Sequence, residues 1–195
     1  MTIPIDQDEP LLRILRFETK TFLHAIAARS DLLQPVLEVG PMTQAGAASG
    51  VFVRMPETFV DSPRLFQNAG SEYMSLDIDP SANPTQVGDI TMADKLFPAA
   101  SIGTAILLSC LEHVPRVWDV PRVLQQILKP GGRAFILTPW NLRFHGPRPD
   151  CWRISDDGYR ALFADGFEIE ALEQIECPGR PLMPVGMKCV VRKPV

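Results

Sequence analysis

The chain has 195 residues, of which 46% are hydrophobic and 22% charged, values that fit one folded domain and exclude wholesale disorder. Its formal net charge of −4, without a basic stripe, argues against nucleic-acid binding. No apolar run approaches the roughly 18 residues of a transmembrane helix, and residues 1–10 lack a signal-peptide core, so we expect a cytoplasmic protein without a membrane partner.

The first predicted element is an amphipathic helix over residues 11–30. Its apolar side chains recur at helical spacing on one face, at Leu11, Leu15, Phe22 and Ile26. A proline at position 35 follows the helical pattern and limits its extent. We expect residues 1–34 to form an N-terminal helical segment packed on a domain that spans residues 35–195.

Short β-type runs follow the helix. Three of them are predicted at residues 36–39, 73–79 and 86–89, with one short helix between residues 41 and 71. The run 104–109 is almost wholly apolar, as in a strand that is buried on both faces. Such a strand favours a parallel sheet covered by helices.

The second half of the chain continues to alternate between helices and strands. A helix is predicted from Asp119, its expected N-cap, to a Pro-Gly-Gly stop, and another opens at Ser155. Strands are predicted at residues 133–138, 167–172 and 186–191. The alternation predicts an α/β fold with a mostly parallel, seven-stranded sheet, and the short last connection permits an antiparallel edge strand.

Acidic residues lie at or just past the ends of four of the predicted strands, at Glu38, Asp77, Asp89 and Glu112. In an open α/β sheet, ligands bind outside the carboxyl ends of the strands. The turn after the first strand contains no lysine or arginine, so it is poorly suited to a polyphosphate. A nucleoside without phosphates fits these charges better.

The cysteines and histidines show no metal-binding spacing. Four cysteines are widely separated, without a Cys-x-x-Cys motif, which is typical of free thiols in a reducing compartment. His24, His113 and His145 form no zinc motif with them. We therefore expect no metal site.

Several segments together resemble the class I S-adenosylmethionine-dependent methyltransferases of the kind called type 11. The matching segments occur in family order over about residues 35–172 and read VLEVG, YMSLDID, VGDI, LSCLEHV, LKPGG and HGPRPDCWRIS. The pair LEHV and LKPGG is the most specific part. The resemblance implies a Rossmann-like three-layer sandwich, S-adenosylmethionine as cofactor, and methyl transfer to a small-molecule or sugar acceptor.

The resemblance also implies roles for individual residues. Glu38 would engage the amino end of the cofactor, Asp77 the ribose hydroxyls, and Asp89 the adenine amino group. For Asp89, an Asx turn or helix cap is the alternative. The remaining implied cofactor-binding residues are Gly40, Pro41, Gly46, Ile78, Ile90, Ser109 and Leu111.

The candidates for catalysis and acceptor binding allow two interpretations each. His113 could be a general base, because imidazole titrates near neutrality, or a structural histidine that holds a loop. Four residues of the loop after the fifth strand could recognise the acceptor: His145, Asp150, Trp152 and Arg153. Alternatively, Asp150 and Arg153 form a structural ion pair with Trp152 packed beneath.

The loop after the first strand departs from the family pattern. Residues 38–46 read EVGPMTQAG, so Gly40 is present, but Met42 and Gln44 stand where the family has glycines. Pro41 also removes one backbone donor. This motivates a second hypothesis, a catalytically inactive methyltransferase-like binding or regulatory module. A nicotinamide dehydrogenase is less favoured because no Gly-x-Gly-x-x-Gly follows the strand.

Overall fold

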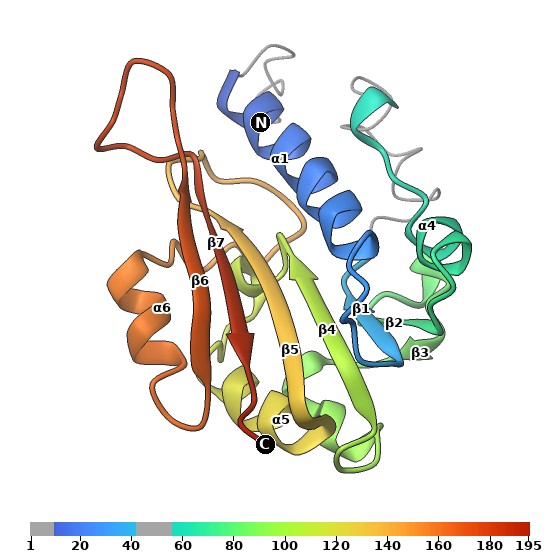
Figure 1. The fold of residues 1–195 in the computed structure, drawn as a ribbon. Coiled ribbons are helices and arrows are strands. Elements are labelled where there is room, and N and C mark those ends of the chain that lie inside the picture. The colour runs from blue at the N-terminus through green and yellow to red at the C-terminus, as the bar shows by residue number, and fades with distance from the viewer. Residues whose placement is uncertain (1–9, 42–55) are drawn as a thin grey trace.

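A seven-stranded sheet forms the middle layer of the computed structural model, which describes residues 10–41 and 56–195 (Figure 1). The strand order is β3-β2-β1-β4-β5-β7-β6. The strands are β1 (Val36–Val39), β2 (Tyr73–Asp77), β3 (Gln86–Val87), β4 (Ile102–Leu108), β5 (Leu128–Pro139), β6 (Glu168–Ile175) and β7 (Gly186–Arg192). The strands β1 to β5 pair in parallel, whereas β7 is antiparallel to both β5 and β6. The predicted mostly parallel sheet is confirmed.

Helices cover both faces of this sheet. In Figure 1, α1 (Pro10–Ala27) and α4 (Ser62–Asn68) lie on one side, and α5 (Asp119–Ile127) and α6 (Asp156–Leu162) lie on the other. Four short 3-10 helices complete the described elements: η1 (Pro56–Thr58), η2 (Pro80–Ala82), η3 (Ile90–Lys95) and η4 (Leu111–His113). The three-layer α/β sandwich is therefore present. Within the described residues, no helix combines the length and the apolar character needed to cross a membrane.

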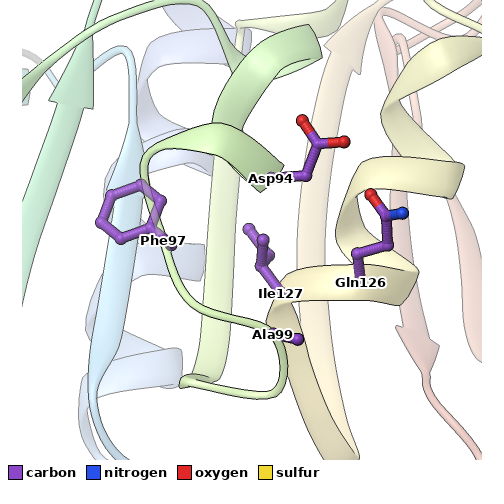
Figure 2. A pocket seen from close by; sticks show the side chains of 5 residues that line it. All are labelled: Asp94, Phe97, Ala99, Gln126 and Ile127. Carbon is purple, nitrogen blue, oxygen red and sulfur yellow. The ribbon is translucent and has the colours of Figure 1, made fainter.

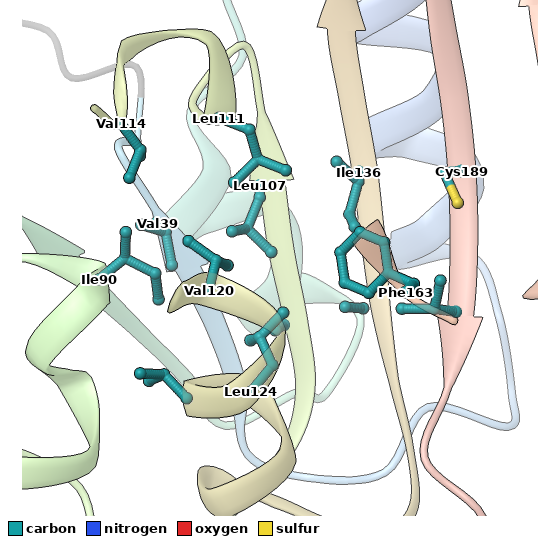
Figure 3. Packing of buried hydrophobic residues seen from close by; sticks show 14 of the residues in the cluster. Val39, Ile90, Leu107, Leu111, Val114, Val120, Leu124, Ile136, Phe163 and Cys189 are labelled. Atoms are coloured by element: carbon teal, nitrogen blue, oxygen red, sulfur yellow. The ribbon is translucent and has the colours of Figure 1, made fainter. Parts of the chain in front are cut away.

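The core consists of two hydrophobic clusters, one on each face of the sheet. All seven residues of β4 are buried, and successive side chains point to opposite faces: Ala105 and Leu107 join the first cluster, Ile106 and Leu108 the second. Figure 3 shows side chains of β4, β5 and α5 meeting in the first cluster. Burial of each large aliphatic side chain contributes roughly 1.5–3 kcal/mol. This explains why β4 is apolar along its whole length.

The helix α1 contributes to the second cluster. Leu15, Leu23 and Ile26 are buried there together with Phe135 and Leu137 of β5. The helix thus buries the apolar stripe that its sequence periodicity predicted.

Two local predictions are wrong. The N-cap of α5 is Trp118, and Asp119 is instead in the first turn, with Oδ2 2.8 Å from Arg116 Nε. The fifth strand begins at Leu128, not Arg133, because Leu128 already pairs with Ile102 before the register shifts at the Pro-Gly-Gly segment. By contrast, Ser155 caps α6 as expected, since its Oγ accepts a hydrogen bond from the Gly158 N–H.

Candidate functional site

The candidate site lies at the carboxyl ends of β1, β2 and β4. The chain runs outward from β1 through β2 to β3 on one side, and from β4 to β5 on the other. The strand order therefore reverses between β1 and β4. Such a switch point creates a crevice at the carboxyl edge, where ligands of α/β sheets bind.

Asp77 ends β2 beside this crevice. Its carboxyl is partly buried, and Oδ1 accepts the Asp79 N–H at 2.9 Å. Burial is the largest influence on the carboxyl and raises its pKa. The next residue, Ile78, is 70% exposed. The chain turns immediately afterwards, because Asp79 caps η2.

Asp89 and Ile90 follow β3. Asp89 Oδ1 accepts hydrogen bonds from the N–H of Thr91 at 2.8 Å and from its Oγ1 at 2.9 Å, so Asp89 caps η3. Ile90 is buried in the first hydrophobic cluster, and Figure 3 shows it beside Val39 at the end of β1. The capping alternative for Asp89 is thus present in the structure.

Glu38 is more deeply buried than Asp77 and Asp89. Its carboxyl is buried, and Oε2 accepts a hydrogen bond from Tyr73 Oη at 2.7 Å. Burial raises the pKa of Glu38, partly offset by the Tyr73 hydrogen bond. This partnership arises because β1 and β2 are adjacent, and no sequence pattern links the two residues.

Two strand ends adopt left-handed backbone conformations. Gly40 has φ +66°, and Ser109, at the end of β4, has φ +53° while its N–H donates to the Leu137 carbonyl at 2.7 Å. A left-handed serine is uncommon, and such residues cluster at functional sites. Pro41 follows Gly40 directly and is half-buried, whereas Gly46 lies outside the described residues.

Acids that follow or end several strands act electrostatically on one thiol, Cys110. Burial raises the pKa of Cys110, and the negative charges of Glu112, Asp77 and Asp89 raise it further. The thiol is therefore protonated and not a nucleophile. The same three carboxylates contribute negative charge at this edge, which favours a cationic ligand.

The turn after β4, η4, is joined to the segment 140–153. The Glu112 carbonyl accepts the N–H groups of Cys151 at 2.7 Å and Trp152 at 3.3 Å. The indole of Trp152 donates to the Val114 carbonyl at 2.8 Å. Leu111, also predicted as a site residue, is fully buried beneath this contact in the first cluster.

An ion pair organises the same segment. Arg153 Nη1 and Nη2 donate to the two oxygens of Asp150 at 2.6 and 3.0 Å, and Arg153 also donates to the carbonyls of Leu142 and Arg143. Asp150 Oδ2 accepts the His145 N–H as well. The hydrogen bonds from Arg153 are the main reason why the pKa of Asp150 lies well below its usual range. These bonds support the architectural alternative for Asp150 and Arg153.

The segment places His145 against His113. The ring centroids are 5.0 Å apart, and each Nε2 is 3.8 Å from Glu112 Oε1. The Glu112 side chain has no exposed surface. A second buried ionic group, Arg16 of α1, is near the same carboxylate: burial lowers the pKa of Arg16 to about 10, and the charge of Glu112 opposes that change. Sequence reasoning missed Arg16 entirely and noted Glu112 only as a strand-end acid.

A separate hollow opens between η3 and α5 (Figure 2). Its volume is about 180 Å³, below the roughly 300–1,000 Å³ of typical ligand pockets. It is lined by Asp94, Phe97, Ala99, Gln126 and Ile127. Ala99 precedes β4, so the hollow lies near the amino end of that strand, and none of the predicted site residues lines it.

Comparisons with known proteins match the fold. No protein-family model matches the chain, and no curated protein matches it in sequence. A S-adenosylmethionine-dependent methyltransferase from Archaeoglobus fulgidus is 15% identical, with a TM-score of 0.63 over 95% of this chain and 100% of that chain. A 1,6-didemethyltoxoflavin N1-methyltransferase from Burkholderia thailandensis, with bound S-adenosylhomocysteine, is 15% identical, with a TM-score of 0.56 over 93% and 79%.

A third solved structure, the [4+2]-cyclase SpnF, is 16% identical, with a TM-score of 0.59 over 90% of this chain and 80% of that chain. The fold of the class I S-adenosylmethionine-dependent methyltransferases, which the motifs predicted, is thereby confirmed. Because one structure of this fold is described as a cyclase, the reaction has to be argued from the site.

Proposed function

We propose that the protein binds S-adenosylmethionine at the carboxyl ends of β1, β2 and β4 and transfers its methyl group to a small-molecule acceptor. The observation that carries the proposal is Asp77, a partly buried carboxylate at the end of β2 beside the strand-order switch. A carboxylate there can accept hydrogen bonds from two ribose hydroxyls. The chain combines sequence segments that resemble the methyltransferase motifs with the fold of these enzymes, and this combination supports the proposal.

The charges of the site fit this cofactor. When bound, S-adenosylmethionine supplies a methyl group on a positively charged sulfur that is also a good leaving group. Asp77, Asp89 and Glu112 all act on the Cys110 thiol and so provide negative potential at this edge. That potential stabilises a cation at the point where β4 ends.

The residues of the chain would mainly position the reactants. Ser109 and Leu111 would approach the cofactor through their backbone, and Ile78, which is 70% exposed just after β2, would offer it an apolar side chain. In-line positioning of an acceptor supplies much of the acceleration for such a transfer. His113 is the candidate base, because Nδ1 contacts the Pro149 carbonyl at 2.8 Å and so leaves Nε2 without a proton.

The second candidate function is a binding or regulatory module without catalysis. Pro41, Met42 and Gln44 favour it, because they occupy the loop that approaches the methionine part of the cofactor in the family. The two candidates differ in whether the protein binds S-adenosylmethionine.

Calorimetric titration with S-adenosylmethionine tests the proposal. We expect the Asp77→Asn variant to bind about 10- to 100-fold more weakly, because it loses charge-assisted hydrogen bonds worth roughly 1.5–3 kcal/mol. Asp79→Asn is the matched control. It removes the same charge only two residues further along the chain, at an exposed position that caps η2.

The control variant should bind like the wild type. Absence of binding to the wild type at millimolar cofactor would reject the proposal and favour the non-catalytic module. Equal binding by the Asp77→Asn variant would place the cofactor elsewhere.

A further inference from the structure

Three side chains with metal-binding atoms converge beside η4. Glu112, His113 and His145 each offer one ligand atom, and these atoms all lie within 4.8 Å of one another. We propose that they form a binding site for a divalent transition metal of the zinc class. Two histidines and one glutamate are a ligand set of catalytic zinc sites, and all three are ligands that zinc accepts.

The buried carboxylate is the first argument for this site. Glu112 has no exposed side-chain surface, and neither of its oxygens has a hydrogen-bond partner in the part of the chain that the structure describes. An unpaired buried carboxylate is costly, and a bound cation is one of the ways in which proteins compensate it.

The second argument is the hydrogen bonding of the two imidazoles. His113 Nδ1 lies 2.8 Å from the Pro149 carbonyl, which can only accept, so Nδ1 carries the proton. His145 Nδ1 lies 3.3 Å from both the Arg143 carbonyl and Asp150 Oδ2, which are also acceptors. Such outer partners orient metal-binding histidines and leave Nε2 free to bind the metal.

These assignments leave three electron-pair donors facing one another. Each Nε2 is 3.8 Å from Glu112 Oε1, which is too long for a hydrogen bond. Zinc bonds of 2.0–2.1 Å correspond to ligand–ligand distances of roughly 3.3 Å in a tetrahedron. Small side-chain rotations would therefore close the three atoms around a cation.

The surroundings define the kind of site. The side chains of His113 and His145 are 15% and 21% exposed, so water or an acceptor can reach an open coordination position. Arg16 and Arg153 also act electrostatically with Glu112. Because these cations oppose a metal ion, we expect weaker binding than at a closed structural zinc site.

The metal site does not depend on methyl transfer, but it has one consequence for the proposed role of His113. A metal on Nε2 would occupy the lone pair that a general base needs, so metal-loaded His113 would not be the base. The metal site and the cofactor site can be tested separately, since Asp77 is not a ligand in this cluster.

Cobalt titration of the tag-free, full-length protein tests the site. After removal of bound metal with a chelator, we expect one equivalent of Co²⁺ to give visible d–d absorption without a thiolate charge-transfer band, and Zn²⁺ to displace it. His145→Ala and Glu112→Gln should weaken Co²⁺ binding at least 10-fold. His24→Ala is the matched control, because His24 is exposed on α1 and is not among the three grouped ligands.

The wild-type spectrum decides even where a variant fails to fold. Absence of Co²⁺ binding at millimolar concentration would overturn the proposal. A thiolate charge-transfer band would overturn it as well, because a cysteine would then hold the metal. The proposal would also be overturned if the His145→Ala variant bound Co²⁺ as tightly as the wild type while far-ultraviolet circular dichroism showed that the variant was folded.

Discussion

The acidic residues of the carboxyl edge have different tasks, and their surroundings decide which. Asp89 and Asp150 use their oxygens to hold the chain, as a helix cap and as an ion-pair partner. Asp77 also accepts a backbone N–H, but it ends its strand at the crevice with part of its carboxyl exposed. Residue type alone therefore does not separate an acid that could bind a ligand from a structural one, and Asp77 differs from Asp150 in having, within the residues that the structure describes, no side-chain cation as its hydrogen-bond partner.

Glu38 provides a pH-dependent prediction at this scale. Burial raises its pKa in the folded state, so between the unfolded value of 4.5 and the raised value the folded protein holds more protons than the unfolded chain. The stability contributed by this group is present below pH 4.5 and is lost as the pH rises through the folded pKa. Glu38→Gln should abolish that loss.

The measurement is the free energy of unfolding of both proteins from pH 4.5 to 8. We expect the stability of the Glu38→Gln variant relative to the wild type to increase with pH. Glu176→Gln, at an exposed position, is the control and should show no such trend. A stability difference for Glu38→Gln that does not change with pH would contradict the assigned cause.

The partners of single residues were the least predictable part of the sequence. Glu38 and Tyr73 are 35 positions apart, and Glu112 and His145 are 33 apart, so only the folded sheet brings them together. The motif resemblance identified the positions of Asp77, Asp89 and His113, but not what they contact. The expectation of no metal site rested on the spacing of histidines and cysteines, whereas the proposed site uses Glu112, whose place beside the histidines depends on the fold.

The segment 140–153 is an element without regular secondary structure, and polar contacts hold it in place. Asp150 binds Arg153 and His145, and Trp152 and Cys151 bind to η4. Asp150→Asn should destabilise the protein by roughly 2–3 kcal/mol at pH 7, because Arg153 loses its charged partner while its side chain is only 23% exposed.

The pH dependence of this variant has the opposite sign to that of Glu38→Gln. The lowered pKa of Asp150 contributes stability above the unfolded value of 3.8, and this contribution is lost as the pH falls through the folded value. Chemical denaturation should therefore show a difference that is largest near neutrality and smaller below pH 3.8. Asp165→Asn, in an exposed turn, is the control; if it destabilised the protein equally, the ion pair would not be the cause.

Element types were predictable where one periodicity dominated. The apolar run of β4 and the helical stripe of α1 are examples, since each is buried against the core. Boundaries depended on tertiary pairing. The strand β5 begins early because Leu128 pairs with Ile102 of β4, and Gly131 separately donates its N–H to the carbonyl of Lys193, which follows β7. A Pro-Gly-Gly sequence reads as a helix stop and a turn, and its pairing partners are not visible in the local pattern.

At the scale of the whole molecule, alternation of strands and helices was enough to predict the α/β class and the parallel core. The expected antiparallel pairing at the end of the chain is also present, but β7 inserts between β5 and β6 and so leaves β6 at the edge. The order of strands determines where the switch point falls. That placement brings the acids at or after the ends of β2, β3 and β4 to the carboxyl edge at which we propose that the cofactor binds.

A crystal structure of the protein grown with S-adenosylhomocysteine would test this account most directly. It should show the ribose hydroxyls within hydrogen-bond distance of the Asp77 carboxylate and the adenosine part of the cofactor beside Ile78. Cofactor bound away from the ends of β1, β2 and β4, or a ribose without contact to Asp77, would contradict it.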